Sequence, residues 1–181
     1  MACLEIAYRL ENGRPLVDVV TGDPFQSVVT EIATPAIATG FGSKTPVYDP
    51  SSTRMFVLCG SGPNCSLPGI PSVERTQLLR QEALELALYT FKYVNADSVV
   101  EFLPGRPKVR PNLALFFRRD ELGLFLSHPL RTTLPGKPPL SPADVDPIQA
   151  RRVDLVTLGH LFRFQLQSAS GGGGLLVLDR G

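Results

Sequence analysis

The chain has 181 residues, of which 43% are hydrophobic and 19% are charged, and its formal net charge is +1. This length is typical of one globular domain, and the balance of apolar and charged residues excludes wholesale disorder. The small net charge also argues against a dedicated nucleic-acid-binding protein, which usually carries a strong basic excess. We therefore expect a single globular domain over residues 1–181.

The sequence shows no targeting or membrane segment. Residues Met1 to Glu5 lack the basic and apolar regions of a signal peptide. No run approaches the ~18 uninterrupted apolar residues of a membrane span. We therefore expect a chain without a membrane-spanning segment.

The first part of the chain predicts a hairpin followed by a helix. Residues 4–10 alternate apolar and polar side chains, Asn12-Gly13 is a strong turn signal, and a second strand is expected over 16–20. Asp23-Pro24 has the chemistry of a helix N-terminus. In that helix one face would carry the apolar side chains Phe25, Val28, Val29 and Ile32.

The middle of the chain contains the clearest predicted element. Residues 34–52 hold prolines and glycines without a hydrophobic period and are expected to form a long loop, whereas Met55 to Cys59 predicts a buried strand. Ser72 can cap a helix that runs over 73–94. Apolar side chains cover most of its circumference, so we expect it to be central and mostly buried. Its remaining polar residues form a narrow stripe: Gln81, Glu85 and Lys92.

Two further strands and two further helices are expected in the next section. The strands are predicted over Ser98 to Leu103 and Leu113 to Phe117. Asp120 is placed to cap a short helix that reaches Leu126. Residues 135–147 contain five prolines and predict a loop. Two helix starts compete for a segment that reaches about Leu158, namely Ser141-Pro142 and Asp146-Pro147.

The C-terminal part predicts two strands joined by a glycine-rich loop. Phe162, Phe164 and Leu166 alternate with polar residues, and glycines 171–174 precede a second apolar run, Leu175 to Leu178. The fold class that follows is α+β: a largely antiparallel sheet packed against the long central helix at 73–94, with short extra helices. A strand–helix–strand unit over 54–103 would add one parallel pair.

Two of the three cysteines are disulfide candidates. Cys59 and Cys65 flank a stretch with two glycines and a proline, which permits the close approach that a disulfide needs. A disulfide and two free thiols both fit this spacing. A disulfide would indicate an oxidising compartment, and on that condition we favour an extracytoplasmic location. No Cys or His pair has zinc-site spacing, so no metal is expected.

The glycine-rich loop before the central helix lacks a nucleotide-binding motif. Gly60-Ser61-Gly62 follows a predicted strand, where phosphate-cradling loops occur. However, no Gly-Lys-Ser/Thr follows it, and the third glycine of a dinucleotide fingerprint is absent. We therefore expect a turn and no cofactor.

A basic segment with aromatic residues is the candidate binding surface. Phe116 and Phe117 lie within it, and such a pattern occurs in single-strand nucleic-acid binding. Phe116 and Phe117 also fit the core pattern of a strand, and Asp120 and Glu121 offset the charge, so the pattern first indicates a solvated loop with strand-end arginines. The alternative is an acidic protein surface that docks on this face. The basic residues are Arg106, Lys108, Arg110, Arg118 and Arg119.

The sequence favours a non-enzymatic binding or protein-interaction domain. Long loops rich in proline and glycine offer surfaces for binding, and no local catalytic motif is present. The alternative is a hydrolase or transferase whose site is assembled from distant residues, such as Ser61 with His128. His160 is a second candidate base, and Cys59 and Cys65 are further candidate nucleophiles.

Overall fold

The structure is a computed structural model that describes residues 19–20, 29–35, 37–39, 42–58, 72–104, 112–128 and 145–180. Eight strands within these stretches form one sheet, in the order β1-β6-β7-β8-β9-β10-β2-β5. These strands are β1 (Val19–Val20), β2 (Val29–Ala33), β5 (Val47–Tyr48), β6 (Thr53–Leu58), β7 (Ser98–Phe102), β8 (Leu113–Arg118), β9 (Leu161–Ser168) and β10 (Gly174–Asp179). A separate two-stranded ribbon consists of β3 (Ile37–Thr39) and β4 (Gly42–Lys44).

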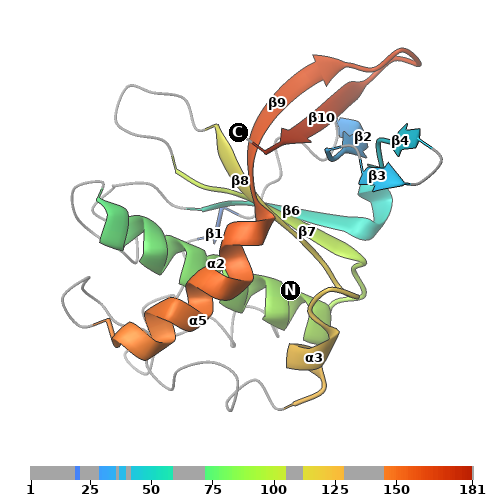
Figure 1. Cartoon of the computed structure of the whole chain (residues 1–181). Coiled ribbons are helices and arrows are strands. Elements are labelled where there is room, and N and C mark those ends of the chain that lie inside the picture. Colours follow the sequence, from blue (N-terminus) through green and yellow to red (C-terminus); the bar gives the residue numbers. More distant parts are fainter. Residues whose placement is uncertain are drawn as a thin grey trace.

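The helices α2, α3 and α5 lie on one side of this sheet (Figure 1). Their bounds are Val73–Tyr93 for α2, Gly123–Leu126 for α3 and Pro147–Thr157 for α5. Two short 3-10 helices are η1 (Pro50–Ser52), before β6, and η3 (Leu158–His160), which follows α5. None of the helices in the described stretches combines the length and the hydropathy that a bilayer-spanning segment needs.

The sheet is largely antiparallel, as the sequence predicts. Five of its strand pairs are antiparallel and two are parallel. One parallel pair joins β6 to β7 across α2, which confirms the expected strand–helix–strand unit. The other parallel pair, β10 with β2, joins the C-terminal part of the chain to its N-terminal part. The α+β fold class is therefore confirmed.

Helix α2 forms where the sequence places it because both of its ends are capped. The Ser72 side chain accepts a hydrogen bond from Arg75 N at 3.1 Å, and Val94 N donates to Thr90 O at 2.7 Å. Between the caps the helix is buried on nearly all sides. Its apolar side chains pack on one face of the sheet in a core that includes Leu86 and Phe117. Two residues of the polar stripe are buried too, since Gln81 and Glu85 are only 3% and 4% exposed, whereas Lys92 is exposed.

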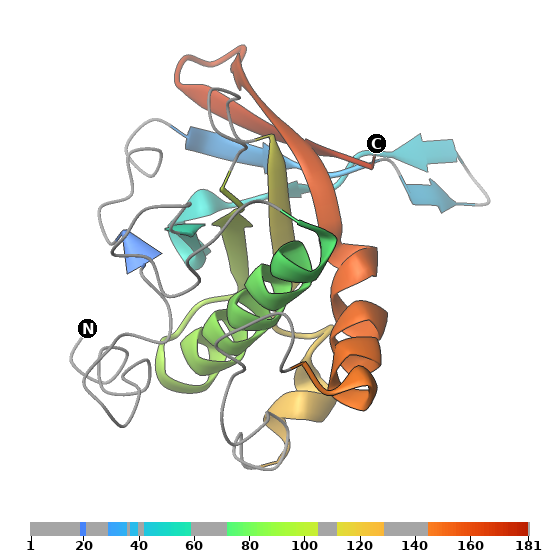
Figure 2. The same ribbon diagram turned by 90° about the vertical axis from the view of Figure 1, so that its left-hand side faces the viewer.

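The sheet curls around a second core on its other face. Tyr48 of β5 lies against Phe116 of β8, with ring centroids 5.1 Å apart. In a flat sheet these strands, four places apart, would be separated by about 19 Å. The second core fills the concave side and includes Ile32, Phe102 and Phe162. Figure 2 shows the result, with α2 on one side of β6–β8 and β2 with β10 on the other.

Two expectations for the N-terminal part are wrong. The helix expected after Asp23 is replaced, from Val29 onward, by strand β2. The expected loop over 34–52 contains strands β3, β4 and β5 and the 3-10 helix η1. Pairing of β2 with β10 is a long-range interaction that overrides the local helical pattern, because β-branched residues also suit a strand. Of the hairpin expected over 4–20, only Val19–Val20 lies within the described residues, and it pairs with β6.

Of the helix starts predicted in the C-terminal half, one is confirmed, one is wrong and one lies outside the described residues. Asp146 caps α5, because its Oδ1 accepts from Ile148 N at 2.9 Å. The rival start at Ser141 lies outside the described residues. Asp120 does not cap α3, because that helix begins only at Gly123. The Asp120 carboxylate instead binds Arg118 at 2.6 Å.

The predicted C-terminal hairpin is confirmed and its glycines have a structural reason. Gly172 and Gly173 have φ angles of 86° and 89°, which side chains rarely tolerate. A Cβ on Gly173 would also lie 2.4 Å from the Thr30 side chain. The glycine run thus allows β10 to turn back and pass close to β2.

Candidate interaction surface

Two of the five basic residues predicted to bind a partner are described, and their side chains diverge. Arg118 ends β8 and Arg119 follows it, so the two side chains leave opposite faces of the strand. The other three residues, Arg106, Lys108 and Arg110, lie outside the described residues. The predicted basic surface is therefore described only at its C-terminal end.

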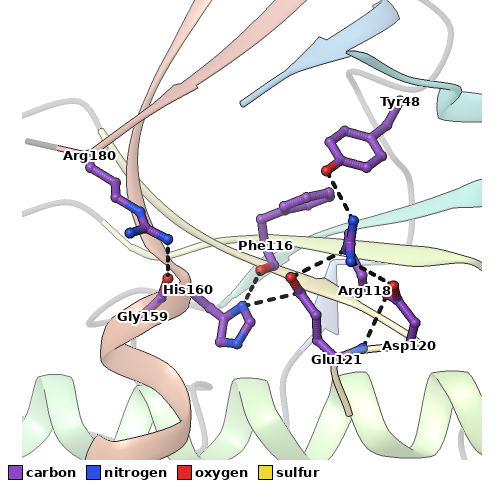
Figure 3. Close-up of polar contacts among 8 residues, drawn as sticks. All are labelled: Tyr48, Phe116, Arg118, Asp120, Glu121, Gly159, His160 and Arg180. Atoms are coloured by element: carbon purple, nitrogen blue, oxygen red, sulfur yellow. Dashed lines mark hydrogen bonds and ion pairs between the residues drawn. The ribbon is translucent and has the colours of Figure 1, made fainter. Parts of the chain in front are cut away.

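Arg118 is held inside the chain by three partners (Figure 3). Its Nη2 lies 2.6 Å from Asp120 Oδ2, and its Nη1 donates to Tyr48 Oη at 3.4 Å. Its Nε lies 3.3 Å from Glu121 Oε1, as an ion pair rather than an aligned hydrogen bond. Burial lowers the pKa of Arg118, but Tyr48 and the two carboxylates outweigh it and raise that pKa overall. The guanidinium thus fastens β5 and the turn after β8 to the sheet.

Arg119 closes the C-terminal end of α2. Its Nη2 donates to Val94 O at 2.9 Å and its Nε donates to Ala96 O at 2.8 Å. The guanidinium also lies over the Phe91 ring, 5.5 Å from its centroid. Because a cation near the carboxyl end of a helix satisfies its free carbonyls, Arg119 has a structural role in this fold.

His160 makes the one contact between a histidine and a carboxylate among the described residues (Figure 3). Its Nδ1 lies 3.1 Å from Phe116 O and 3.6 Å from Glu121 Oε2. A carboxylate behind a histidine is part of the arrangement that nucleophilic catalysis needs. In the described part of the chain, however, no serine or cysteine side chain is hydrogen-bonded to His160. The candidate nucleophiles Ser61, Cys59 and Cys65 lie outside that part.

His128 lies at the exposed end of α3. Its Nδ1 is 2.9 Å from Ser127 Oγ and 3.2 Å from Leu124 O. The Ser127 hydroxyl itself donates to Leu124 O at 2.7 Å. These contacts close the last turn of a short helix, and no described carboxylate contacts the imidazole. The described residues also contain no group of three His, Cys, Asp or Glu side chains suited to a metal ion.

Helix α5 is fastened to α2 by a polar joint. Arg80 of α2 donates to Asp154 Oδ1 at 2.6 Å and to Thr157 Oγ1 at 2.9 Å. Gln77 Nε2 donates to the other oxygen of Asp154 at 3.2 Å. Val153 is buried beside this joint. The inner side of α5 is therefore fixed, and its opposite side is turned to solvent.

The outer face of α5 carries three apolar and two basic side chains. At about 100° per residue, these five positions fall within an arc of about 120° opposite Val153 and Thr157. Ile148, Leu155 and Leu158 are 66%, 77% and 57% exposed. The arc runs on into η3, whose first residue, Leu158, keeps helical backbone angles. We call this arc the α5 outer face, and it consists of Ile148, Arg151, Arg152, Leu155 and Leu158.

This density of exposed apolar side chains distinguishes α5 from the other described elements. Scattered single apolar residues are normal on a protein surface, whereas a contiguous group indicates an interaction site. The other large exposed apolar side chains are distributed over four other elements, with two of them at opposite ends of α2. They are Val47, Val73, Tyr93, Leu124 and Leu166.

Comparisons with protein-family models, curated proteins and solved structures find no match to this chain.

Proposed function

We propose that this chain is a protein-interaction domain that binds a partner protein through the α5 outer face. The observation that carries the proposal is the alignment of Ile148, Leu155 and Leu158 on one exposed arc. Burial of these side chains in a complex would remove apolar surface from water, which is the main driving force of protein association. The helix that presents them is already anchored to α2, so binding would require little ordering of the chain.

The partner proposed from the sequence, an acidic protein surface, fits the α5 outer face better than the end of β8. Arg118 and Arg119 already have partners within the chain. Arg151 and Arg152 are exposed and have no hydrogen-bond or ion-pair partner among the described residues. Two available guanidinium groups beside apolar side chains would favour a partner that presents carboxylates.

Site-specific photo-crosslinking tests this proposal. A photoreactive residue placed at Leu155 of the full chain in its native cells should give a discrete adduct with a partner protein. Adding Ile148→Asp should remove the adduct, because a carboxylate would replace an apolar contact. The matched control places the same group at Gln167, an exposed residue of β9. The same adducts from both positions, or none from Leu155, would contradict the proposal.

A further inference from the structure

We propose that the segment bound by the α5 outer face is an acidic amphipathic helix that lies along α5. This inference rests on the proposed function and names the chemistry of the partner. It follows from three properties of the face: its charge, its lack of free backbone groups, and the spacing of its apolar side chains.

The charge of the α5 outer face is entirely basic. The nearest acidic side chains on α5 are both occupied, since Asp154 binds Arg80 and Asp146 caps the helix. Arg151 and Arg152 therefore meet no carboxylate among the described residues. Burial of two unpaired guanidinium groups would be costly, so an apolar partner must also supply acidic groups.

The backbone of α5 favours a helical partner over an extended one. An extended peptide adds to a protein by hydrogen bonding to an open strand edge. A helix face offers no such edge, because its backbone groups bond within the helix. A segment that docks on α5 must satisfy its own backbone, and a helix does so.

The spacing of the apolar side chains fits a helix laid alongside. Ile148, Leu155 and Leu158 extend over roughly 15 Å at 1.5 Å per residue, which is about three turns. Partner leucines at every third or fourth position would meet them. Glutamates beside those leucines would then reach Arg151 and Arg152, as flanking charges do in coiled coils.

A membrane surface fits the same face less well. Helices that lie in a membrane separate their charged residues from the apolar face. On α5 the two arginines lie within the same arc as the apolar residues, because Arg151 and Leu155 are neighbours at i and i+4. A protein can pair these guanidinium groups with carboxylates, whereas the apolar part of a bilayer cannot.

Fluorescence anisotropy with a designed peptide tests the partner class. The probe is a labelled peptide of about 18 residues with leucines at i, i+3, i+4 and i+7 and glutamates beside them, which can fold on binding. We expect saturable binding to the full chain that weakens about tenfold for Arg151→Glu with Arg152→Glu, because two ion pairs are lost. A peptide with the same composition but scrambled leucine positions is the control, and it should bind weakly.

Charge reversal separates pairing from loss of fold. A peptide with lysines in place of the glutamates should bind the Arg151→Glu, Arg152→Glu variant better than it binds the natural chain. The melting temperature of this double variant should equal that of the natural chain. Equal binding of the acidic peptide to both proteins would overturn the inference. The inference would also be overturned if the natural chain, but not the double variant, bound phosphatidylserine vesicles. Self-association of the chain that Leu155→Asp abolishes would overturn it as well. A crosslinked adduct at Leu155 without peptide binding would overturn this partner class alone and leave the proposed function intact.

Discussion

At the scale of single residues, two glutamates inside the fold lack a cationic partner among the described residues. Glu101 of β7 is fully buried, and neither of its carboxylate oxygens has a hydrogen-bond partner there. Glu85 of α2 is also buried and accepts a hydrogen bond from Gln81 at 3.3 Å. Burial raises the pKa of Glu101 well above its usual value. It raises the pKa of Glu85 to about 7, although the Gln81 hydrogen bond opposes the shift. Burial therefore favours the neutral form of both carboxyl groups over their charged form, compared with the same groups in water.

The raised pKa of Glu85 should make the chain less stable as pH rises. A carboxyl whose pKa is higher in the folded state binds its proton more tightly there, so its contribution is complete below pH 4.5. That contribution is lost as pH rises from 4.5 to about 7. We expect Glu85→Gln to raise the free energy of unfolding by roughly 3 kcal/mol at pH 8 and to leave it nearly unchanged at pH 4. Urea denaturation at the two pH values measures this.

The matched control for this experiment is Glu74→Gln in the same helix. Glu74 is exposed in the first turn, and hydrogen bonds from its own backbone and from Ser72 lower its pKa. We expect Glu74→Gln to leave the fall in the free energy of unfolding between pH 5 and pH 8 the same as in the natural chain, as measured by urea denaturation. If Glu85→Gln showed that same pH dependence, the carboxyl of Glu85 would not be the group that titrates.

At the scale of elements, α2 is the helix on which the sheet depends. Leu86 is almost completely buried in the core between α2 and the sheet. We expect Leu86→Asp to unfold the chain, because the change removes apolar contacts and buries an unpaired charge. Loss of helical circular dichroism and of a thermal transition would show this. Val73→Asp is the control, since Val73 is exposed at the N-terminus of α2, where the helix dipole favours a carboxylate. A normal melting temperature for Leu86→Asp would contradict the central role of α2.

The elements that the sequence predicts well are those with local signals. Ser72 and Asp146 start α2 and α5, and the alternation of Phe162 and Phe164 marks β9. The strand β2 has no such signal, because its pattern also fits a helix and only its pairing with β10 decides between the two. Short strands such as β5 are defined by their neighbours in the sheet rather than by their own residues.

The candidate interaction surface is also only partly predictable from the sequence, because long-range contacts decide which side chains stay available. The basic residues at the end of β8 were identified from their charge, but Arg118 binds Tyr48, which lies 70 residues away in the sequence. No sequence pattern reports that contact. For α5, the sequence contains apolar residues on more than one side of the helix, including Val153 and Leu155. Which side is buried depends on Arg80 of α2, and so the exposed face emerges only from the packing.

At the scale of the whole molecule, the sheet joins distant parts of the chain. β10 pairs with β2, and β1 pairs with β6. The strands of the described N-terminal part therefore complete a sheet whose other members come from the middle and the end of the chain. Loss of β2 or of β10 would expose a strand edge and part of the second core. The three cysteines, Cys3, Cys59 and Cys65, all lie outside the described residues.

The state of the cysteines is the prediction that bears on the compartment. We expect a bond between Cys59 and Cys65, so that denatured, unreduced chain from its native compartment shows one reactive thiol, at Cys3, and the reduced chain shows three. Because the closed loop is short, the chain-entropy model gives at most about 2–3 kcal/mol of stabilisation. Reduction should therefore lower the melting temperature without abolishing the cooperative transition. In a Cys3→Ser variant the unreduced count should fall to zero, which assigns the free thiol. Three free thiols in the unreduced natural chain would contradict the bond, and the prediction of an extracytoplasmic location would lose its chemical basis, because a reducing compartment keeps such thiols free.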